Sequence, residues 1–318
     1  MTNNKATFAD YLKITRLDHG TKQVFIIPGI FFAYLLRGIH VSNPLSHILL
    51  GFLCATAIAS ANYVINEWFD REFDKFHPTK FKRTAVQRIL TGKAIAFEWS
   101  LLVGIGLLAA YLSSKLMFIV ACIFFLQGIF YNIPPLRTKD RAFVDVLSES
   151  INNPIRLMIG WAMIDPNSLP PASIIFSYWS GGAFLMAAKR YSEYREITQA
   201  FNLETLTNYR KSFKGYTEIS LNVSCLVYAM LSNFFIGVFF IKYRIEYIIT
   251  IPVVILLFGE YLAVSMKPNS TAQNPEKLYK EKSLFILISI FLLTLLIASL
   301  YDIDFLKDLS QQFFIKLN

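Results

Sequence analysis

Long apolar stretches limit what this chain can fold into more than any other feature of its sequence. A run of about 18 or more mostly apolar residues is long enough to cross the hydrocarbon core of a bilayer as a helix. Hydrophobic residues make up 54% of the 318 residues and charged residues only 17%. We therefore predict an all-α, polytopic membrane protein with nine transmembrane helices. The predicted spans are residues 22–39, 44–66, 95–113, 115–132, 143–163, 172–188, 218–241, 246–266 and 284–301.

The cations of the chain, which has a net charge of +9, gather in alternate loops. The loops that follow spans two, four, six and eight are basic, whereas the connections between them carry few cations. Cytoplasmic loops of membrane proteins are enriched in Lys and Arg, so the amino terminus and the basic loops are predicted to face the cytoplasm. No cleavable signal peptide is visible at the amino terminus, and the first span would itself direct insertion. We expect an integral protein of the bacterial inner (plasma) membrane.

The distribution of cations also bears on partners. A basic chain could bind nucleic acid, but these cations lie in loops between spans and no nucleic-acid-binding motif is present. Anionic lipid headgroups and phosphorylated substrates suit such loops better. The three cysteines, Cys54, Cys122 and Cys225, all lie within predicted spans, which favours apolar packing over disulfide pairing.

The chain is predicted to form a single transmembrane domain over residues 1–318, with an interfacial amino-terminal segment at 1–21 and an interfacial tail at 302–318. In the first segment Phe8, Tyr11 and Leu12 share one helical face, while Ile14 falls off it. The two long basic loops, residues 67–94 and 189–215, occupy corresponding places after even-numbered spans. This correspondence suggests two related halves.

A polar stripe leaves the second span and reaches the cytoplasmic surface. Asn66, Asp70 and Asp74 recur every fourth residue, so on a helix they stack on one face. Mg²⁺ is usually bound by one or two carboxylates and completes its shell with waters and substrate phosphates. A solvated helix end, with Glu67 paired to Arg71, would also explain acids here, but it would not explain why the stripe begins at Asn62, inside the membrane. We predict a Mg²⁺ site at Asn66, Asp70 and Asp74 for a diphosphate substrate.

Cations follow the acids directly. Pro78 ends the helix one turn past Asp74, since the residue before a proline is disfavoured in the α conformation. His77, Lys80 and Arg83 could then fold over a substrate held by the metal. A positive-inside loop without a ligand would explain the charges but not the position of the proline.

Other candidate substrate-binding residues lie near span ends. An Arg side chain suits bidentate phosphate recognition, and an ionisable residue within a span marks a functional site by default. Membrane-end Lys and Arg are also common headgroup anchors, and this alternative stays open. The further candidates are Lys22, Arg137, Lys139, Arg156, Lys189, Arg190, Tyr191 and Glu193.

Taken in order, these motifs resemble the UbiA-type superfamily of intramembrane prenyltransferases, and most closely its decaprenyl-phosphate phosphoribosyltransferase branch. The superfamily's first Asn-x-x-x-Asp-x-x-x-Asp motif corresponds to Asn66, Asp70 and Asp74. The HPxK motif of the branch corresponds to His77, Pro78 and Lys80, and its KRYxE motif to Lys189, Arg190, Tyr191 and Glu193. A Pro-Glu stretch before the last span is similar to residues 274–277. The resemblance covers about residues 17–297.

Two departures from the family pattern matter. Position 67 is Glu where the branch usually has Asp. The Asp-rich second motif of the aromatic prenyltransferases is absent after span six, where Lys189 and Arg190 stand instead. Cations in place of acids fit a donor with an extra phosphate, such as 5-phosphoribosyl 1-diphosphate.

The resemblance implies a cytoplasm-facing cavity in which phosphoribose is transferred from 5-phosphoribosyl 1-diphosphate to a polyprenyl phosphate, with Mg²⁺ and release of diphosphate. Lys80, Arg83, Lys189 and Arg190 would bind the ribose 5-phosphate, and Arg137, Lys139 and Arg156 the lipid phosphate. Two alternatives remain: transfer of a prenyl group from a prenyl diphosphate to an aromatic or other acceptor, and transport of an anionic substrate. Self-association into a homo-oligomer is left open.

Overall fold

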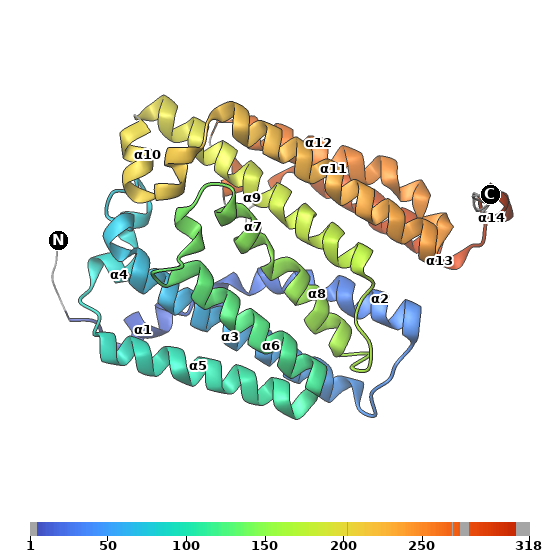
Figure 1. Ribbon diagram of the computed structural model, residues 1–318, viewed down its shortest axis with the longest axis horizontal. Helices are drawn as coiled ribbons and strands as arrows, with labels where there is room; N and C mark the ends of the chain where they lie inside the picture. Colours follow the sequence, from blue (N-terminus) through green and yellow to red (C-terminus); the bar gives the residue numbers. More distant parts are fainter. Residues whose placement is uncertain (1–4, 202, 269, 274–279, 310–318) are drawn as a thin grey trace, which may run out of the picture. The chain divides into compact units, whose positions relative to one another are not determined.

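The computed structural model describes residues 5–201, 203–268, 270–273 and 280–309, without the side chains of His19 and Leu309, and is built from helices (Figure 1). This confirms the predicted all-α membrane fold. The α-helices are α1 (Phe8–Ile14), α2 (Ile27–Arg37), α3 (Pro44–Asp74), α4 (Thr84–Gln87), α5 (Gly92–Ser113), α6 (Lys115–Asn132), α7 (Val144–Ser150), α8 (Asn152–Ala162), α9 (Ala172–Ala200), α10 (Leu203–Tyr209), α11 (Glu218–Tyr243), α12 (Ile251–Met266), α13 (Lys282–Leu300) and α14 (Asp304–Leu309). The 3₁₀ segments are η1 (Leu17–Ile26), η2 (Lys80–Lys82), η3 (Thr138–Asp140), η4 (Lys211–Gly215), η5 (Ile245–Thr250) and η6 (Thr271–Gln273).

Six helical stretches in the described part of the chain are long and apolar enough to cross a membrane, so the count of nine stays a prediction. The predicted first span begins within η1, which leaves only 11 residues for α2. The predicted fifth span is divided at Ile151 into α7 and α8, just before Pro154. The predicted sixth span is the first part of α9, a 29-residue helix whose second half is charged. The six stretches are Pro44–Asp74, Gly92–Ser113, Lys115–Asn132, Glu218–Tyr243, Ile245–Met266 and Lys282–Leu300.

The chain divides into two compact units. Unit 1 comprises residues 1–170 and 193–221, and unit 2 comprises residues 171–192 and 222–318. In unit 1, α3 packs against α5 and α6, and α2 packs against α8 (Figure 1). The prediction of a single domain over 1–318 stays a prediction.

Helix α3 is the longest element and carries the polar stripe. It begins at Pro44, where the Asn43 side chain accepts a hydrogen bond from the Ser46 N–H (3.3 Å) and so caps the first turn. Small buried residues such as Cys54, Ala55 and Ala61 line its middle and allow neighbouring helices to approach closely. The helix continues to Asp74 and ends before Pro78, as predicted from the proline.

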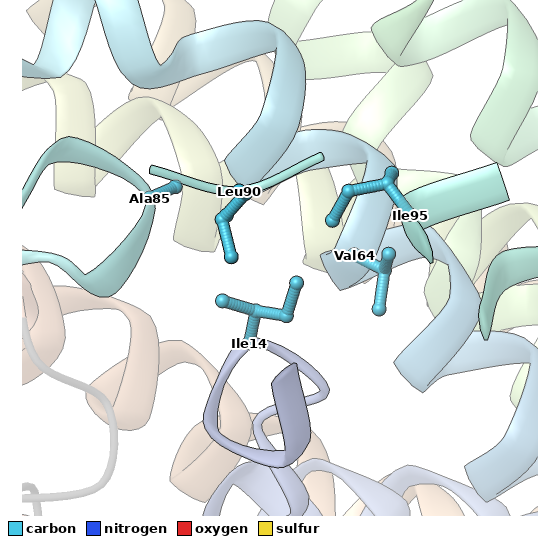
Figure 2. Packing of buried hydrophobic residues seen from close by; sticks show 5 residues of the cluster. All are labelled: Ile14, Val64, Ala85, Leu90 and Ile95. Atoms are coloured by element: carbon cyan, nitrogen blue, oxygen red, sulfur yellow. The ribbon is translucent and has the colours of Figure 1, made fainter. Parts of the chain in front are cut away.

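A cluster of buried hydrophobic residues anchors the start of the chain beside the polar end of α3. Ile14 of α1, Val64 of α3 and Ala85 of α4 pack together with Leu90 and Ile95 (Figure 2).

Phe8 and Leu12 of the face predicted for the amino-terminal segment are exposed on α1, and the interfacial position of this segment stays a prediction. Ile14, which lies off that face, is the buried residue, whereas Phe8 is 79% exposed. The packing surface of so short a helix is set by what it contacts, and α1 contacts α3 and α4.

Unit 2 contains the first part of α9, α11 from residue 222 onward, and the helices α12 to α14. Ser177 of α9 and Ser232 of α11 exchange hydrogen bonds with each other's backbone carbonyls, at 3.1 and 3.0 Å. The Phe184 ring packs edge-on against the Phe258 ring of α12. Of the predicted tail, α14 covers Asp304–Leu309, and residues 310–318 lie outside the described residues, as do residues 274–277 of the Pro-Glu stretch.

Candidate active site

Asn66, Asp70 and Asp74 lie one turn apart on α3, as their spacing predicts. The stripe passes from a half-buried amide to two carboxylates, of which Asp74 is buried and Asp70 keeps 19% of its side chain exposed. All three therefore belong to one face of a single helix in unit 1.

Two cations from the loop after α6 lie against Asp70. Its Oδ1 atom is 2.7 Å from Lys139 Nζ and accepts a hydrogen bond from Arg137 Nη2 at 2.8 Å. Arg137 also donates to both carboxylate oxygens of Asp140 and to the Phe69 carbonyl. These contacts hold Arg137 at a φ of +25°, a backbone conformation that non-glycine residues rarely adopt. The loop is thus folded back onto α3, with two cations against one carboxylate.

Asp74 is paired with the loop that follows α3. Arg83 Nη1 donates to Asp74 Oδ2 at 2.5 Å, and Arg83 Nε lies 3.9 Å from Glu67 Oε1. Glu67 accepts a short hydrogen bond from Arg16 rather than pairing with Arg71, whose guanidinium stacks on the Trp68 ring.

His77 closes the turn between α3 and η2. Its Nδ1 accepts hydrogen bonds from the backbone N–H groups of Thr79 (3.2 Å) and Lys80 (3.3 Å), so the ring proton lies on Nε2. Nε2 then donates to Glu193 Oε1 at 3.4 Å. Burial lowers the pKa of His77 below its ordinary value, against the opposing effect of Glu193, and so favours the neutral ring.

The Glu193 carboxylate has three donor side chains near it, from two other segments of unit 1. Besides His77, its Oε1 accepts from Tyr209 OH at 3.0 Å and lies 3.5 Å from Lys80 Nζ. The His77 ring also packs against the Tyr209 ring, with the ring centroids 4.3 Å apart. This cluster joins the loop after α3, the second half of α9 and α10.

Lys22 and Arg156 lie beside a different stretch of α3. Lys22 Nζ is 5.3 Å from the centre of the Tyr63 ring, and Arg156 Nε donates to Gln23 Oε1 at 3.3 Å. Arg156, Arg16 and Tyr63 line a small cavity between η1, α3 and α8. Lys22 and Arg156 therefore both lie near Tyr63, which precedes Asn66, Asp70 and Asp74 along α3.

Lys189, Arg190 and Tyr191 belong to unit 2. They lie on α9, where Arg190 and Tyr191 are buried and Lys189 is half-buried. Glu193, on the next turn of the same helix, is assigned to unit 1. The grouping of the KRYxE residues with the acidic face stays a prediction.

The donor set on α3 fits Mg²⁺ in its chemistry, since it offers one amide oxygen and two carboxylates. Among the described residues, no three His, Cys, Asp or Glu side chains form a group that could hold a metal ion by themselves. Mg²⁺ is seldom bound by an all-protein cage and relies on substrate phosphates and waters instead. The row of Asn66, Asp70 and Asp74 on α3, called the ladder below, is therefore suited to a metal that arrives with a phosphorylated substrate.

Several buried polar residues around this face were not predicted from the sequence. Asn132, the last residue of α6, accepts from Asn66 Nδ2 at 2.7 Å and from Lys139 Nζ at 2.8 Å. Arg210 lies 3.5 Å from the fully buried Asp145 and donates to Tyr131 OH at 3.1 Å. A single polar residue at a span end is a weak sequence signal, which is why Asn132 was missed.

The comparison with protein families decides what kind of protein has this arrangement. The model of the UbiA prenyltransferase family matches residues 26–291. The chain belongs to the UbiA prenyltransferase family. This membership accounts for the helical membrane fold and confirms the resemblance to the UbiA superfamily, whereas the phosphoribosyltransferase branch stays a prediction.

Individual UbiA relatives are distant. Protoheme IX farnesyltransferase 2 of Bacillus subtilis is 26% identical over 197 residues, which cover 58% of this chain and 62% of that protein. The chain thus spans about three-fifths of the length of this relative. A UbiA homologue from Archaeoglobus fulgidus, solved bound to GPP and Mg²⁺, has a TM-score of 0.68 at 17% identity, covering 91% of this chain and 99% of that one. A digeranylgeranylglyceryl phosphate synthase structure has a TM-score of 0.62 at 16% identity, covering 92% and 98%.

Proposed function

We propose that this chain transfers a group from a donor diphosphate in a Mg²⁺-dependent reaction at the membrane, and that the donor is a prenyl diphosphate. The observation that carries the proposal is the acidic ladder of α3 with Arg137 and Lys139 against Asp70. A diphosphate is polyanionic, and its binding calls for a divalent ion and for directed cationic donors.

The choice of a prenyl donor rests on family membership and on the names of the relatives. The chain is a UbiA prenyltransferase family member, its Bacillus relatives are named farnesyltransferases, and a structural neighbour was solved with GPP and Mg²⁺. These findings support prenyl transfer more than the phosphoribosyl transfer expected from the motifs.

In the proposed reaction Asn66, Asp70 and Asp74 hold Mg²⁺, which supplies positive charge at the leaving diphosphate when bound. The C1–O bond of the donor breaks, and its electron pair leaves with the diphosphate. Arg137 and Lys139, already held in place by Asp70, donate hydrogen bonds to the oxygens on which that charge develops. The nucleophilic atom of the acceptor forms the new bond to C1, and its proton passes to solvent.

Phosphoribosyl transfer remains a second candidate because of one observation. Lys189 and Arg190 stand where the family resemblance places the second acidic motif of the aromatic prenyltransferases. A donor with a third phosphate needs additional cations, which Lys80 and Arg83 next to Asp74 would supply. In that reaction the C1–O bond of the ribose breaks and an oxygen of a polyprenyl phosphate, already an anion, forms the new bond.

One pair of assays separates the candidates. The purified chain with Mg²⁺ receives either labelled farnesyl diphosphate with a membrane lipid extract, or labelled phosphoribosyl diphosphate with a polyprenyl phosphate. Label in an organic-soluble product of the first assay that is not the prenyl alcohol supports prenyl transfer. Lipid-linked label in the second assay supports phosphoribosyl transfer.

Two variants complete the test. Asp70→Asn removes a proposed metal ligand and should abolish product in whichever assay is positive. Asp304→Asn makes the same chemical change at a carboxylate that is 95% exposed and should leave the product unchanged. Product formation that is equal in Asp70→Asn and the parent chain contradicts the proposal.

A further inference from the structure

Asn132 joins the proposed metal ligands to the proposed phosphate-binding cations. Its side chain, at the end of α6, is 2% exposed. One oxygen, Oδ1, accepts hydrogen bonds from Asn66 Nδ2 on α3 (2.7 Å) and from Lys139 Nζ on η3 (2.8 Å).

Two independent contacts fix which way the Asn132 amide points. Its Nδ2 donates to the Gly128 carbonyl at 2.9 Å, and a carbonyl can only accept. The Lys139 ammonium can only donate, so the atom facing it must be the amide oxygen. Both contacts require the same orientation, with the nitrogen toward α6 and the oxygen toward Asn66 and Lys139.

Gly128 in turn fixes where α6 lies relative to α3. The Asn62 side chain of α3 fills the space above Gly128, and a Cβ at this position would lie 1.8 Å from Asn62 Oδ1. Asn62 Nδ2 also lies 3.4 Å from the Phe124 carbonyl. The close approach of α3 and α6 at Gly128 therefore fixes the position of Asn132, at the end of α6, relative to Asn66 on α3.

We propose that Asn132 is a positioning residue that turns the amide oxygen of Asn66 toward the metal and holds Lys139 toward the donor diphosphate. The two ends of an amide lie on opposite sides of the group. With Nδ2 of Asn66 engaged by Asn132, its Oδ1 is turned away from α6, and that oxygen is the atom able to bind a cation. This inference rests on the proposed function.

Lys139 is oriented in the same way. An ammonium carries three N–H groups. Asn132 Oδ1 and Asp70 Oδ1, at 2.8 and 2.7 Å, direct two of them. The third donates to a diphosphate oxygen in the proposed complex. Partners of this kind, one step removed from a metal, typically contribute about 10–100-fold to metal affinity or activity.

The test uses Asn132→Leu, which has a similar size and no acceptor. Asn233→Leu is a matched control, because Asn233 makes the same amide-to-carbonyl bond to the residue four positions earlier, Ala229, at 2.9 Å on α11. Binding of Mn²⁺ to the purified full-length chain is measured by electron paramagnetic resonance with inorganic pyrophosphate as the probe. Thermal unfolding is recorded for each variant.

Asn132→Leu should weaken Mn²⁺ binding about 10–100-fold, whereas Asn233→Leu should leave it unchanged. Asn132→Asp keeps an oxygen facing Asn66 and Lys139 and should bind Mn²⁺ more tightly than the leucine variant. If Asn132→Leu does not fold, Asn132→Asp carries the test, and a folded Asn132→Asp that has lost Mn²⁺ as fully as Asp70→Asn overturns the inference.

The two proposals fail in different ways. Mn²⁺ binding that is lost in Asp70→Asn but unchanged in Asn132→Leu overturns the role of Asn132 and leaves the proposed function intact. Mn²⁺ binding that is unchanged in Asp70→Asn overturns the metal site itself.

Discussion

Lys139 Nζ lies 2.7 Å from Asp70 Oδ1, so a buried ammonium from the loop after α6 rests against the middle carboxylate of the α3 ladder. The ladder by itself would repel a diphosphate. With Lys139 and Arg137 against Asp70, the face presents cations and carboxylates together, which is the combination that a metal-diphosphate complex requires.

Loss of the positive charge of Lys139 should lower kcat/KM for the donor at alkaline pH. Burial lowers the pKa of Lys139 to about 8, with Asp70 opposing the shift. Because a lysine loses its charge as pH rises through its pKa, kcat/KM for the donor should fall by about tenfold per pH unit above that value. Lys139→Arg keeps its charge throughout, so the fall should move to higher pH. A pH profile of kcat/KM that is the same in both proteins contradicts this role.

The two nitrogens of His77 make separable contributions. Asn at position 77 can place an acceptor near the position of Nδ1, whereas Gln places its amide near Nε2. Since Nδ1 accepts two backbone N–H groups, His77→Asn should keep the following loop ordered and His77→Gln should loosen it. Trypsin cleavage after Lys80, Lys82 and Arg83 measures the difference, and faster cleavage is expected in the Gln variant. Faster cleavage in the Asn variant instead would assign the main role to Nε2 and Glu193.

The hydrophobic cluster at Ile14 should contribute strongly to stability. Ile14→Ala leaves a cavity among Val64, Ala85, Leu90 and Ile95 (Figure 2) and should lower the free energy of unfolding by about 2–5 kcal/mol. Phe8→Ala removes a larger side chain from the same helix, but this side chain is 79% exposed. The substitution should therefore change the free energy of unfolding by less than about 0.5 kcal/mol. Denaturant unfolding in detergent measures both. Equal losses would mean that α1 is not anchored through Ile14.

Gly128 and Asn62 should be energetically coupled. Gly128→Ala places a methyl group on the Asn62 side chain and should cost about 1–3 kcal/mol of stability through overpacking. Asn62→Ala removes the obstructing amide, so the double variant should be more stable than the sum of the single changes predicts. A double-mutant cycle of thermal unfolding gives the coupling. Strict additivity would indicate that α3 and α6 do not meet at this pair.

The sequence predicted those parts of the structure that depend on regular spacing. The ladder from Asn66 to Asp74 follows from helical periodicity, and the end of α3 before Pro78 follows from the restricted backbone of a proline. Each of these features is local, so nearby residues suffice to predict it.

Features that depend on tertiary contacts could not be predicted from the sequence. The ion pairs of Asp70 arise because the loop after α6 folds back, which depends on a positive φ at Arg137 that nothing in the sequence favours. The predicted first span was apolar enough over residues 22–39, yet its start is wound as η1. Arg210 was one of several cations in a basic loop until the structure placed it beside Asp145.

The imidazole that closes the turn after α3 has a consequence for acidic conditions. Since its folded pKa is lowered, the neutral ring adds stability above its ordinary pKa, and this contribution disappears as pH falls through the folded value. A proton on Nδ1 turns an acceptor into a donor facing two other donors. Acidification should therefore weaken this turn and loosen the loop that carries Lys80.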